Sequence, residues 1–276
     1  SNMSHDIRTP MNGIIGMTQI ALKHLTDQAR VLDCLRKIDE SSQHLLGLIN
    51  EVLDMSKIES GSTELHMEPV MLASLLRSVA DVCLPMAQKK KQKFQTRLER
   101  IGADYVLTDP VRLRQVFINL VSNAVKYTPD GGEVLFEAER LQEERSGYLN
   151  YQFVVKDNGI GMSEEFLERL FEPFAREDNS MTNVTQGTGL GLSIAKSILG
   201  MMGGGIEVKS RQGLGTTFVV TLRLARAKET GEENRLQPER SAADRSRFAG
   251  TRILLVEDNA LNMEIACELL SETGLV

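Results

Sequence analysis

The chain has 276 residues, of which 41% are hydrophobic and 25% are charged, and its formal net charge is −6. These values are those of an ordinary globular protein with enough apolar residues for a core, and the acidic balance argues against general nucleic-acid binding. No apolar run approaches the ~20 residues of a membrane span. The chain has no Trp and three cysteines far apart in sequence, which argues against an aromatic platform and against a cysteine metal site.

Residues 1–60 contain two apolar stripes with helical spacing. The first consists of Ile7, Met11, Ile14, Thr18, Leu22 and Leu25, and the second of Val31, Leu32, Leu35, Ile38, Ser42, Leu45, Ile49, Val52 and Leu53. The segment "HLTDQAR" separates them, and Gly61 follows as a stop signal. The spacing predicts an antiparallel helical hairpin. Its uncovered apolar face predicts a homodimeric four-helix bundle, joined through Ile7, Ile14, Leu45 and Ile49.

After Gly61 the pattern mixes short alternating runs with helical ones. We expect helices over 74–90, 109–128, 163–171 and 190–202, and strands over 93–99, 133–141, 151–159, 205–211 and 216–224. Asp109 is expected to cap the second of these helices, with Pro110 at its first position. The run "KKKQK" at 89–93 is expected to be a solvated helix end. The fold class is therefore α+β, with one sheet and one helical layer behind the hairpin.

Two further segments complete the predicted organisation. Residues 226–250 are polar and lack apolar periodicity, which predicts a flexible linker. "RILLVEDNALNMEIA" predicts a strand, a turn and a helix, and a single unit of this kind cannot form a domain, so we expect more sequence beyond it. The expected domains are 1–60, 61–225, the linker 226–250 and the partial unit 251–276.

The motif "DNGIGM" follows a predicted strand. Gly159 and Gly161 would let backbone N–H groups approach a ligand closely, and a buried Asp157 could accept a hydrogen bond from an exocyclic amine such as that of adenine. The alternative is a plain Asn-Gly turn.

The motif "GTGLGLSI" opens a predicted helix. Gly187, Gly189 and Gly191 could form a nest for phosphates at the helix N-terminus, although the spacing fits neither a Walker loop nor a Rossmann fingerprint. The alternative is a glycine-rich helix start. The polar segment "REDNSMTNVTQ" before it reads as a lid over the phosphate site or as an ordinary mobile loop.

The motif "NLVSNAVKYTP" places Asn119, Asn123 and Lys126 on one helix face. This set suits a hydrated Mg²⁺ whose charge is balanced mainly by nucleotide phosphates. The alternative is capping and packing, and Asn119 in particular could brace the fold. "GLGTTF" and "FEPF" taken alone could be a hairpin turn and a hydrophobic plug.

Six motifs occur in one order: H-D-x-R-T-P, N-L-x-x-N-A-x-K-Y-T, D-N-G-I-G-M, F-E-P-F, G-T-G-L-G-L-S-I and G-x-G-T-x-F. Over about residues 4–224 the chain resembles the histidine kinases of two-component signalling, with their H, N, G1, F, G2 and G3 boxes. Residues 252–266 resemble the start of a response-regulator receiver domain, where Glu257 and Asp258 would lie at a Mg²⁺ site. The resemblance implies a hybrid sensor kinase with a HisKA hairpin and a GHKL ATP-binding domain.

The resemblance assigns the first motif to phosphoryl transfer. It implies that His5 is the phosphoacceptor, and a neutral imidazole has the lone pair that such an attack needs. Asp6 would orient the ring and act as general base. Thr9 would place water for dephosphorylating the partner regulator, or would bond its own helix's carbonyl. Pro10 would bend the helix beyond His5. Only four residues precede His5 here, fewer than the family's first helix normally has.

The resemblance also assigns an ATP and Mg²⁺ site. Asp157 would read the adenine amine, Asn123 would hold the metal with Asn119 in support, and Lys126 with the glycine amides would steady the phosphates. The expected nucleotide-binding residues are Asn119, Asn123, Lys126, Tyr127, Asp157, Gly159, Gly161, Gly187, Thr188, Gly189, Leu190, Gly191 and Thr216.

The expected function is autophosphorylation of a histidine by ATP followed by transfer to a receiver aspartate. The alternatives are a net phosphatase and a catalytically silent nucleotide-binding scaffold. The expected partners are a second copy of the chain and a receiver domain, with a sensor domain upstream and no nucleic acid. The expected location is cytoplasmic, as the intracellular part of a larger sensor.

Overall fold

The computed structural model describes residues 2–141, 147–177, 188–228 and 253–271, without the side chains of Asn2, Met3 and His5. Its contacts divide the chain into two units, 1–229 and 230–276, and each is described by itself. Within the described ranges, no helix is both long and apolar enough to cross a membrane.

The first two helices form the predicted hairpin. Helix α1 is Asn2–Lys23 and helix α2 is Gln28–Glu59, and they pack along each other. Asp27 caps α2, since its carboxylate accepts a hydrogen bond from the Arg30 N–H at 3.1 Å. After α2 the chain turns at Gly61, whose φ of +66° favours glycine. Helix α1 runs through Pro10 without ending there.

The described residues after the hairpin form one seven-stranded sheet. Its strands are β1 (Glu68–Met71), β2 (Lys93–Arg100), β3 (Tyr105–Thr108), β4 (Glu133–Arg140), β5 (Tyr148–Asp157), β6 (Gly205–Arg211) and β7 (Gly215–Arg226). The order is β1-β3-β7-β5-β4-β2, and β6 also pairs with β7. β2 and β4 are parallel and the other pairs are antiparallel. The sequence prediction missed β1 and β3, which are four residues long.

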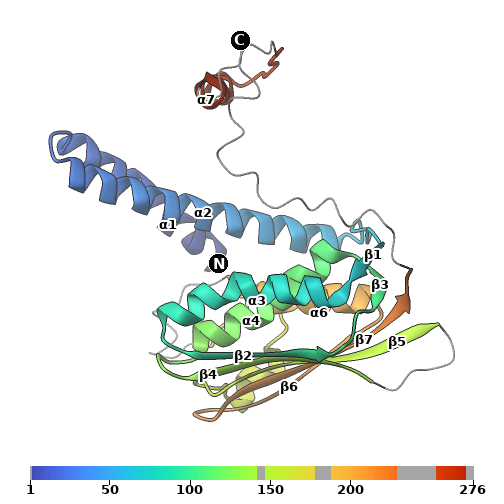
Figure 1. Ribbon diagram of the computed structural model, residues 1–276. Coiled ribbons are helices and arrows are strands. Elements are labelled where there is room, and N and C mark those ends of the chain that lie inside the picture. Colours follow the sequence, from blue (N-terminus) through green and yellow to red (C-terminus); the bar gives the residue numbers. More distant parts are fainter. Residues whose placement is uncertain (1, 142–146, 178–187, 229–252, 272–276) are drawn as a thin grey trace. The chain divides into compact units, whose positions relative to one another are not determined.

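Helices α3 (Leu72–Lys89), α4 (Pro110–Tyr127) and α6 (Gly191–Met201) cover one face of this sheet (Figure 1). Burial alternates along β5, as expected for a strand with one face against a core. Phe117 of α4 lies at the centre, with its ring 4.7 Å from that of Phe153 and 5.6 Å from that of Phe136. The sheet and one helical layer confirm the predicted fold class. The short helix α5 (Glu164–Arg169) follows β5.

The predicted start of helix α4 is confirmed. The Asp109 carboxylate accepts a hydrogen bond from the Arg112 N–H at 3.0 Å, and Pro110 occupies the first turn. A second carboxylate oxygen of Asp109 accepts from the His66 N–H at 3.0 Å, which ties the segment before β1 to the same helix end.

In the second unit the predicted strand is wrong. Residues 253–257 have no strand pairing, whereas α7 (Ala260–Ser271) forms and is capped by Asn259, whose side chain accepts from the Leu261 N–H at 2.9 Å. A strand needs a partner for its N–H and C=O groups, and the described part of this unit contains no second strand. A helix satisfies these groups internally, so only the helix forms. The helix of the predicted receiver start is present, and the receiver itself stays a prediction.

Candidate active site

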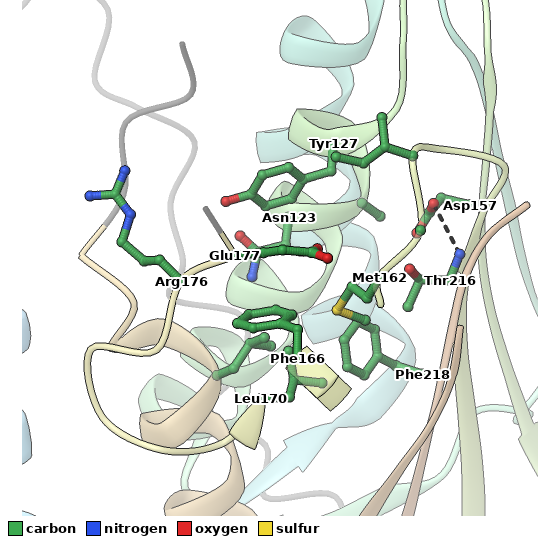
Figure 2. Close-up of a pocket in the computed structure, with 14 residues that line it drawn as sticks. Asn123, Tyr127, Asp157, Met162, Phe166, Leu170, Arg176, Glu177, Thr216 and Phe218 are labelled. Atoms are coloured by element: carbon green, nitrogen blue, oxygen red, sulfur yellow. Dashed lines mark hydrogen bonds between the residues drawn. The ribbon is translucent and has the colours of Figure 1, made fainter. Parts of the chain in front are cut away.

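A cavity between α4, β5, α5 and the start of α6 contains Asp157, the residue predicted to bind the base, and several other predicted nucleotide-binding residues (Figure 2). It is lined by Asn123, Ala124, Tyr127, Asp157, Ile160, Gly161, Met162, Phe166, Leu170, Arg176, Glu177, Leu192, Thr216 and Phe218. Of these residues, the sequence predicted Asn123, Tyr127, Asp157, Gly161 and Thr216. The sequence analysis did not predict the apolar residues around Phe166 and Phe218 that line the cavity. Their pattern is that of ordinary core residues, and only the fold places them at a cavity.

Asp157 presents one carboxylate oxygen to this cavity. It is buried, and its Oδ1 accepts hydrogen bonds from the Gly159 N–H at 2.8 Å and the Thr216 N–H at 3.2 Å. Burial raises the pKa of Asp157, while these two backbone donors lower it. Among the described residues Oδ2 has no such partner, so it is an acceptor suited to an amine hydrogen.

Two glycines let the surrounding loops approach each other. Gly161 has a φ of +63°, and a Cβ there would lie 2.0 Å from the Arg211 carbonyl oxygen. Gly215 has a φ of +96°, and its Cβ would lie 2.1 Å from the Asp157 carbonyl oxygen. Any side chain would therefore push apart the two loops that hold Asp157. Gly161 lines the cavity as predicted, but its close approach is to the protein's own backbone.

A second cavity adjoins the first and is lined by Lys126, the charged residue of the N box. Asn123 and Tyr127 line both cavities, and Asn119, Lys126, Thr188, Gly189 and Gly191 line the second. Burial, with a smaller contribution from the Arg176 charge, lowers the pKa of Lys126 to about 8. The Lys126 ammonium lies 4.9 Å from the centre of the Tyr127 ring. The site therefore contains a poorly solvated cation that a phosphate would stabilise.

Asn119 braces the fold in this structure. Its Nδ2 donates to the Gly191 carbonyl at 3.0 Å and so joins α4 to the first residue of α6. This bond fits the packing alternative, although Asn119 also lines the second cavity, whereas Asn123 lines both cavities.

The described part of the glycine-rich motif is held by three contacts. The Thr188 hydroxyl accepts from the Leu190 N–H at 3.1 Å and donates to the carboxylate of Glu51 on α2. The Gly189 carbonyl accepts from the Phe174 N–H at 3.1 Å. Gly187 and the predicted lid residues 178–186 lie outside the described residues. Glu177, before them, accepts from the Ser163 N–H at 3.0 Å.

The H-box motif begins α1. His5 is helical, but its side chain is not described. Asp6 forms an ion pair with Arg176 at 3.5 Å and lines a small cavity with Phe174, Thr188 and Leu190. Thr9 is exposed. The fold thus brings the start of α1 next to the glycine-rich motif, although the two are far apart in sequence.

Helix α2 contacts α4 and the glycine-rich motif, and the sequence analysis did not predict these contacts. Besides Glu51, Asp54 accepts hydrogen bonds from Arg112 at 3.0 Å and from Gln115 at 2.8 Å on α4. Burial raises the pKa of Glu51, and its bond to Thr188 lowers it. Glu51 and Asp54 belong to none of the motifs, and the helical pattern does not distinguish them from ordinary solvent-exposed residues.

The residues present fit a divalent cation only if a ligand supplies most of its oxygens. In the ranges that the structure describes, no group of three or more His, Cys, Asp and Glu side chains could hold a metal. The Asn123 amide is a neutral oxygen donor between the two cavities. One neutral donor suits Mg²⁺, which keeps several waters and is often bound through substrate phosphates.

Two family models match the chain. Residues 1–61 match the His Kinase A (phospho-acceptor) domain, and residues 108–226 match the histidine kinase-, DNA gyrase B-, and HSP90-like ATPase.

Curated relatives match over nearly the whole chain. Sensor histidine kinase GacS of Pseudomonas protegens is 36% identical over 276 residues, which are 100% of this chain and 29% of GacS. The autoinducer 2 sensor kinase/phosphatase LuxQ of Vibrio parahaemolyticus is 37% identical, over 95% of this chain and 30% of LuxQ. Signal transduction histidine-protein kinase BarA of Escherichia coli is 35% identical, over 100% of this chain and 29% of BarA. The chain thus spans less than a third of the length of these relatives.

Solved structures show the same fold. Full-length ShkA in complex with AMPPNP has a TM-score of 0.61 and 27% identity, over 99% of this chain and 53% of ShkA. The histidine kinase ThkA in complex with the response regulator TrrA has a TM-score of 0.57 and 26% identity, over 80% of this chain and 60% of ThkA.

Proposed function

Because this chain belongs to the two-component sensor histidine kinases, with a phospho-acceptor domain ahead of a histidine-kinase-like ATPase domain, we propose that it transfers the γ-phosphoryl group of ATP to His5. The phosphoryl group then passes to an aspartate of a response-regulator receiver domain. The observation that carries the proposal is the position of Asp6, the residue after His5, which lines the same small cavity as Thr188 of the glycine-rich motif and pairs with Arg176.

The two cavities divide the nucleotide between them. The apolar cavity takes the adenine, whose exocyclic amine donates to the Asp157 oxygen that has no backbone donor. The second cavity takes the phosphates, which Lys126 and the Gly189–Gly191 backbone neutralise. The AMPPNP complex of ShkA supports ATP as the ligand. Bound Mg²⁺ would supply charge neutralisation at the phosphate oxygens, with Asn123 as its protein donor.

The transfer step needs only positioning and charge neutralisation. A lone pair of the neutral His5 imidazole forms the bond to the γ-phosphorus while the bond to the β–γ bridging oxygen breaks, and ADP leaves with that electron pair. The ring then loses its remaining N–H proton to a carboxylate. We assign that role to Asp6, which must first leave Arg176.

Two partners follow from the same assignment. The uncovered apolar face of the α1–α2 hairpin supports a homodimer, as the phospho-acceptor family match also does. The ThkA–TrrA complex supports a response regulator as the phosphoryl acceptor. We keep the domain boundaries 1–60 and 61–225 and an intracellular location, where ATP is present, as part of the proposal.

Incubation with γ-³²P-ATP tests the function directly. We expect label that is stable in alkali and lost in acid, and that His5→Gln abolishes. His66→Gln is the matched control, because His66 lies before β1 and outside both cavities, and it should keep the label. ATP binding without acid-labile label would favour the silent scaffold instead.

A net phosphatase is the second candidate, because LuxQ is named a kinase/phosphatase. Thr9 would then place the attacking water. Thr9→Ala should slow dephosphorylation of a phosphorylated receiver while leaving His5 labelling unchanged. Equal loss of both activities would argue against this role.

A further inference from the structure

The turn between α3 and β2 sends two side chains back into the protein. The sequence predicted that 89–93 is a solvated helix end, and this is wrong for Lys90, which is half-buried, and Gln92, which is 8% exposed. Lys91 in the same turn and Lys93 at the start of β2 are exposed, as predicted. Both inward side chains end at the last turn of α4.

Together Lys90 and Gln92 bind backbone carbonyls in the last turn of α4 and in the residues directly after it. Lys90 Nζ donates to the carbonyl oxygens of residues 125, 126 and 128, at 3.0, 2.9 and 2.5 Å. Gln92 Nε2 donates to those of residues 125, 128 and 129, at 2.9, 2.7 and 3.3 Å. These acceptors fix the orientation of the Gln92 amide, since the reverse orientation would set its oxygen against carbonyl oxygens. Its Oε1 is buried and has no partner among the described residues.

The remaining carbonyls of this helix end are also occupied. The Ala124 carbonyl accepts from the Thr128 N–H at 3.1 Å and from its hydroxyl at 2.7 Å. The Tyr127 carbonyl accepts from the Ile160 N–H at 3.2 Å, which joins the end of α4 to the loop after Asp157. The carbonyls of 124–129 therefore all have donors, and two side chains supply those for four of them.

This helix end carries the nucleotide site. Asn123, Lys126 and Tyr127 project from the same last turn into the two cavities. The Lys90 ammonium lies at the negative end of the helix dipole, where a cation is most favourable. Without it, three converging carbonyl oxygens would repel one another, and the last turn would loosen.

We propose that Lys90 and Gln92 are positioning residues of the nucleotide site, with the Lys90 ammonium acting as a built-in monovalent cation that holds the carbonyls of α4. The proposal rests on the proposed function and extends it from the residues that contact ATP to those that fix their geometry. It differs from a plain structural cap in one respect: loss of Lys90 weakens nucleotide binding by protein that is still folded.

The test measures ATP affinity in folded protein. Lys90→Met and Gln92→Met are compared with the unaltered chain by calorimetric titration of Mg²⁺-ATP, at a temperature where circular dichroism shows each to be folded. We expect about tenfold weaker binding for both, the lower end of what outer-shell residues contribute at other sites. Lys93→Met is the matched control, because Lys93 is the first residue of β2, directly after the turn between α3 and β2, and pairs with Glu133 at the surface at 3.0 Å. It should bind ATP as the unaltered chain does.

Chemical rescue separates positioning from folding. Lys90→Ala leaves a gap facing the three carbonyls, and propylammonium should fill it and restore ATP affinity, whereas it should not change the affinity of Lys93→Ala. Unchanged affinity in folded Lys90→Met and Gln92→Met would overturn the proposal and leave the proposed function intact. If Lys90→Met does not fold, the ATP affinity of Gln92→Met decides between the two outcomes. A failure of the unaltered chain to bind ATP would overturn both.

Discussion

Asp157 is a buried carboxylate whose two oxygens have different tasks. Oδ1 accepts from the Gly159 and Thr216 N–H groups, and in the proposed function Oδ2 accepts from the adenine amine. In Asp157→Asn the amide oxygen still accepts from both backbone N–H groups, but the amide NH₂ then faces the amine of adenine. Because two hydrogen-bond donors then face each other, neither the amide NH₂ nor the adenine amine has an acceptor. We therefore expect ATP binding to weaken about 100-fold.

The same substitution should improve the relative affinity for ITP, whose ring carries a carbonyl oxygen where ATP has the amine. Competition against a fluorescent nucleotide measures both affinities. Equal losses for ATP and ITP would mean that Asp157 only supports the loops.

Lys126 gives the nucleotide site a pH dependence. Its pKa of about 8 is below the ordinary lysine value, so at pH 9 the unliganded side chain is mostly neutral. Phosphates favour the charged form, so ATP binding at pH 9 should take up a proton, and the affinity should fall from pH 7 to pH 9. Because the unfolded chain binds this proton more tightly, the contribution of Lys126 to folding stability increases as the pH rises above 8. The affinity loss is therefore not caused by unfolding at this site.

Calorimetry in two buffers of different ionisation enthalpy measures that proton uptake. Lys126→Met should abolish it and flatten the affinity profile. Proton uptake that persists in Lys126→Met would assign the titration to another group.

At the scale of secondary-structure elements, features set by the local sequence were predicted better than features that depend on tertiary contacts. Helix α4 was predicted to its first residue because Asp109 and Pro110 are local signals whose geometry depends on no other segment. The strands β1 and β3 were missed because each has four residues, too few for a visible alternation. Lys90 and Gln92 were predicted to be solvated because the sequence "KKKQK" does not indicate that the end of α4 lies beside it.

The contact of α2 with the glycine-rich motif places a carboxylate in the phosphate cavity. Glu51 lines that cavity and binds Thr188. A negative charge there opposes nucleotide phosphates, so Glu51→Gln, which keeps an acceptor for Thr188, should tighten ATP binding about threefold to tenfold at low salt. The gain should shrink in 0.5 M salt because of screening. It should also shrink as the pH falls, since the raised pKa of Glu51 neutralises it earlier than an ordinary glutamate.

Asp54→Asn is the control for this effect. Asp54 lies on the same helix, but it binds Arg112 and Gln115 and does not line the phosphate cavity. ATP titrations at two salt concentrations should show no comparable gain for it. An affinity of Glu51→Gln equal to that of the unaltered chain would show that α2 leaves the cavity when ATP binds.

For the whole molecule, the first unit has an apolar surface on its hairpin that the described residues of one copy leave exposed. Leu46, Ile49 and Leu53 of α2 are 53%, 42% and 52% exposed and lie on one helix face. Ile49 belongs to the predicted dimer contacts, whereas Leu45, Ile7 and Ile14 are half-buried, so the exposed seam lies about one residue further along α2 than the sequence pattern suggested. On α1, Met11, Ile15 and Leu22 are exposed in the same way.

Sedimentation velocity should therefore give a particle of twice the 30.7 kDa chain mass at micromolar concentration. Leu46→Asp with Leu53→Asp should shift it to the monomer, because each unpaired charge buried in an apolar interface costs upward of about 2 kcal/mol, or more than tenfold in Kd. Lys37→Glu changes the charge of an exposed residue on the opposite side of the same helix and should leave the dimer intact. Since ATP binds within one first unit, the monomeric variant should keep its ATP affinity, and a parallel loss of affinity would mean that the partner copy completes the site.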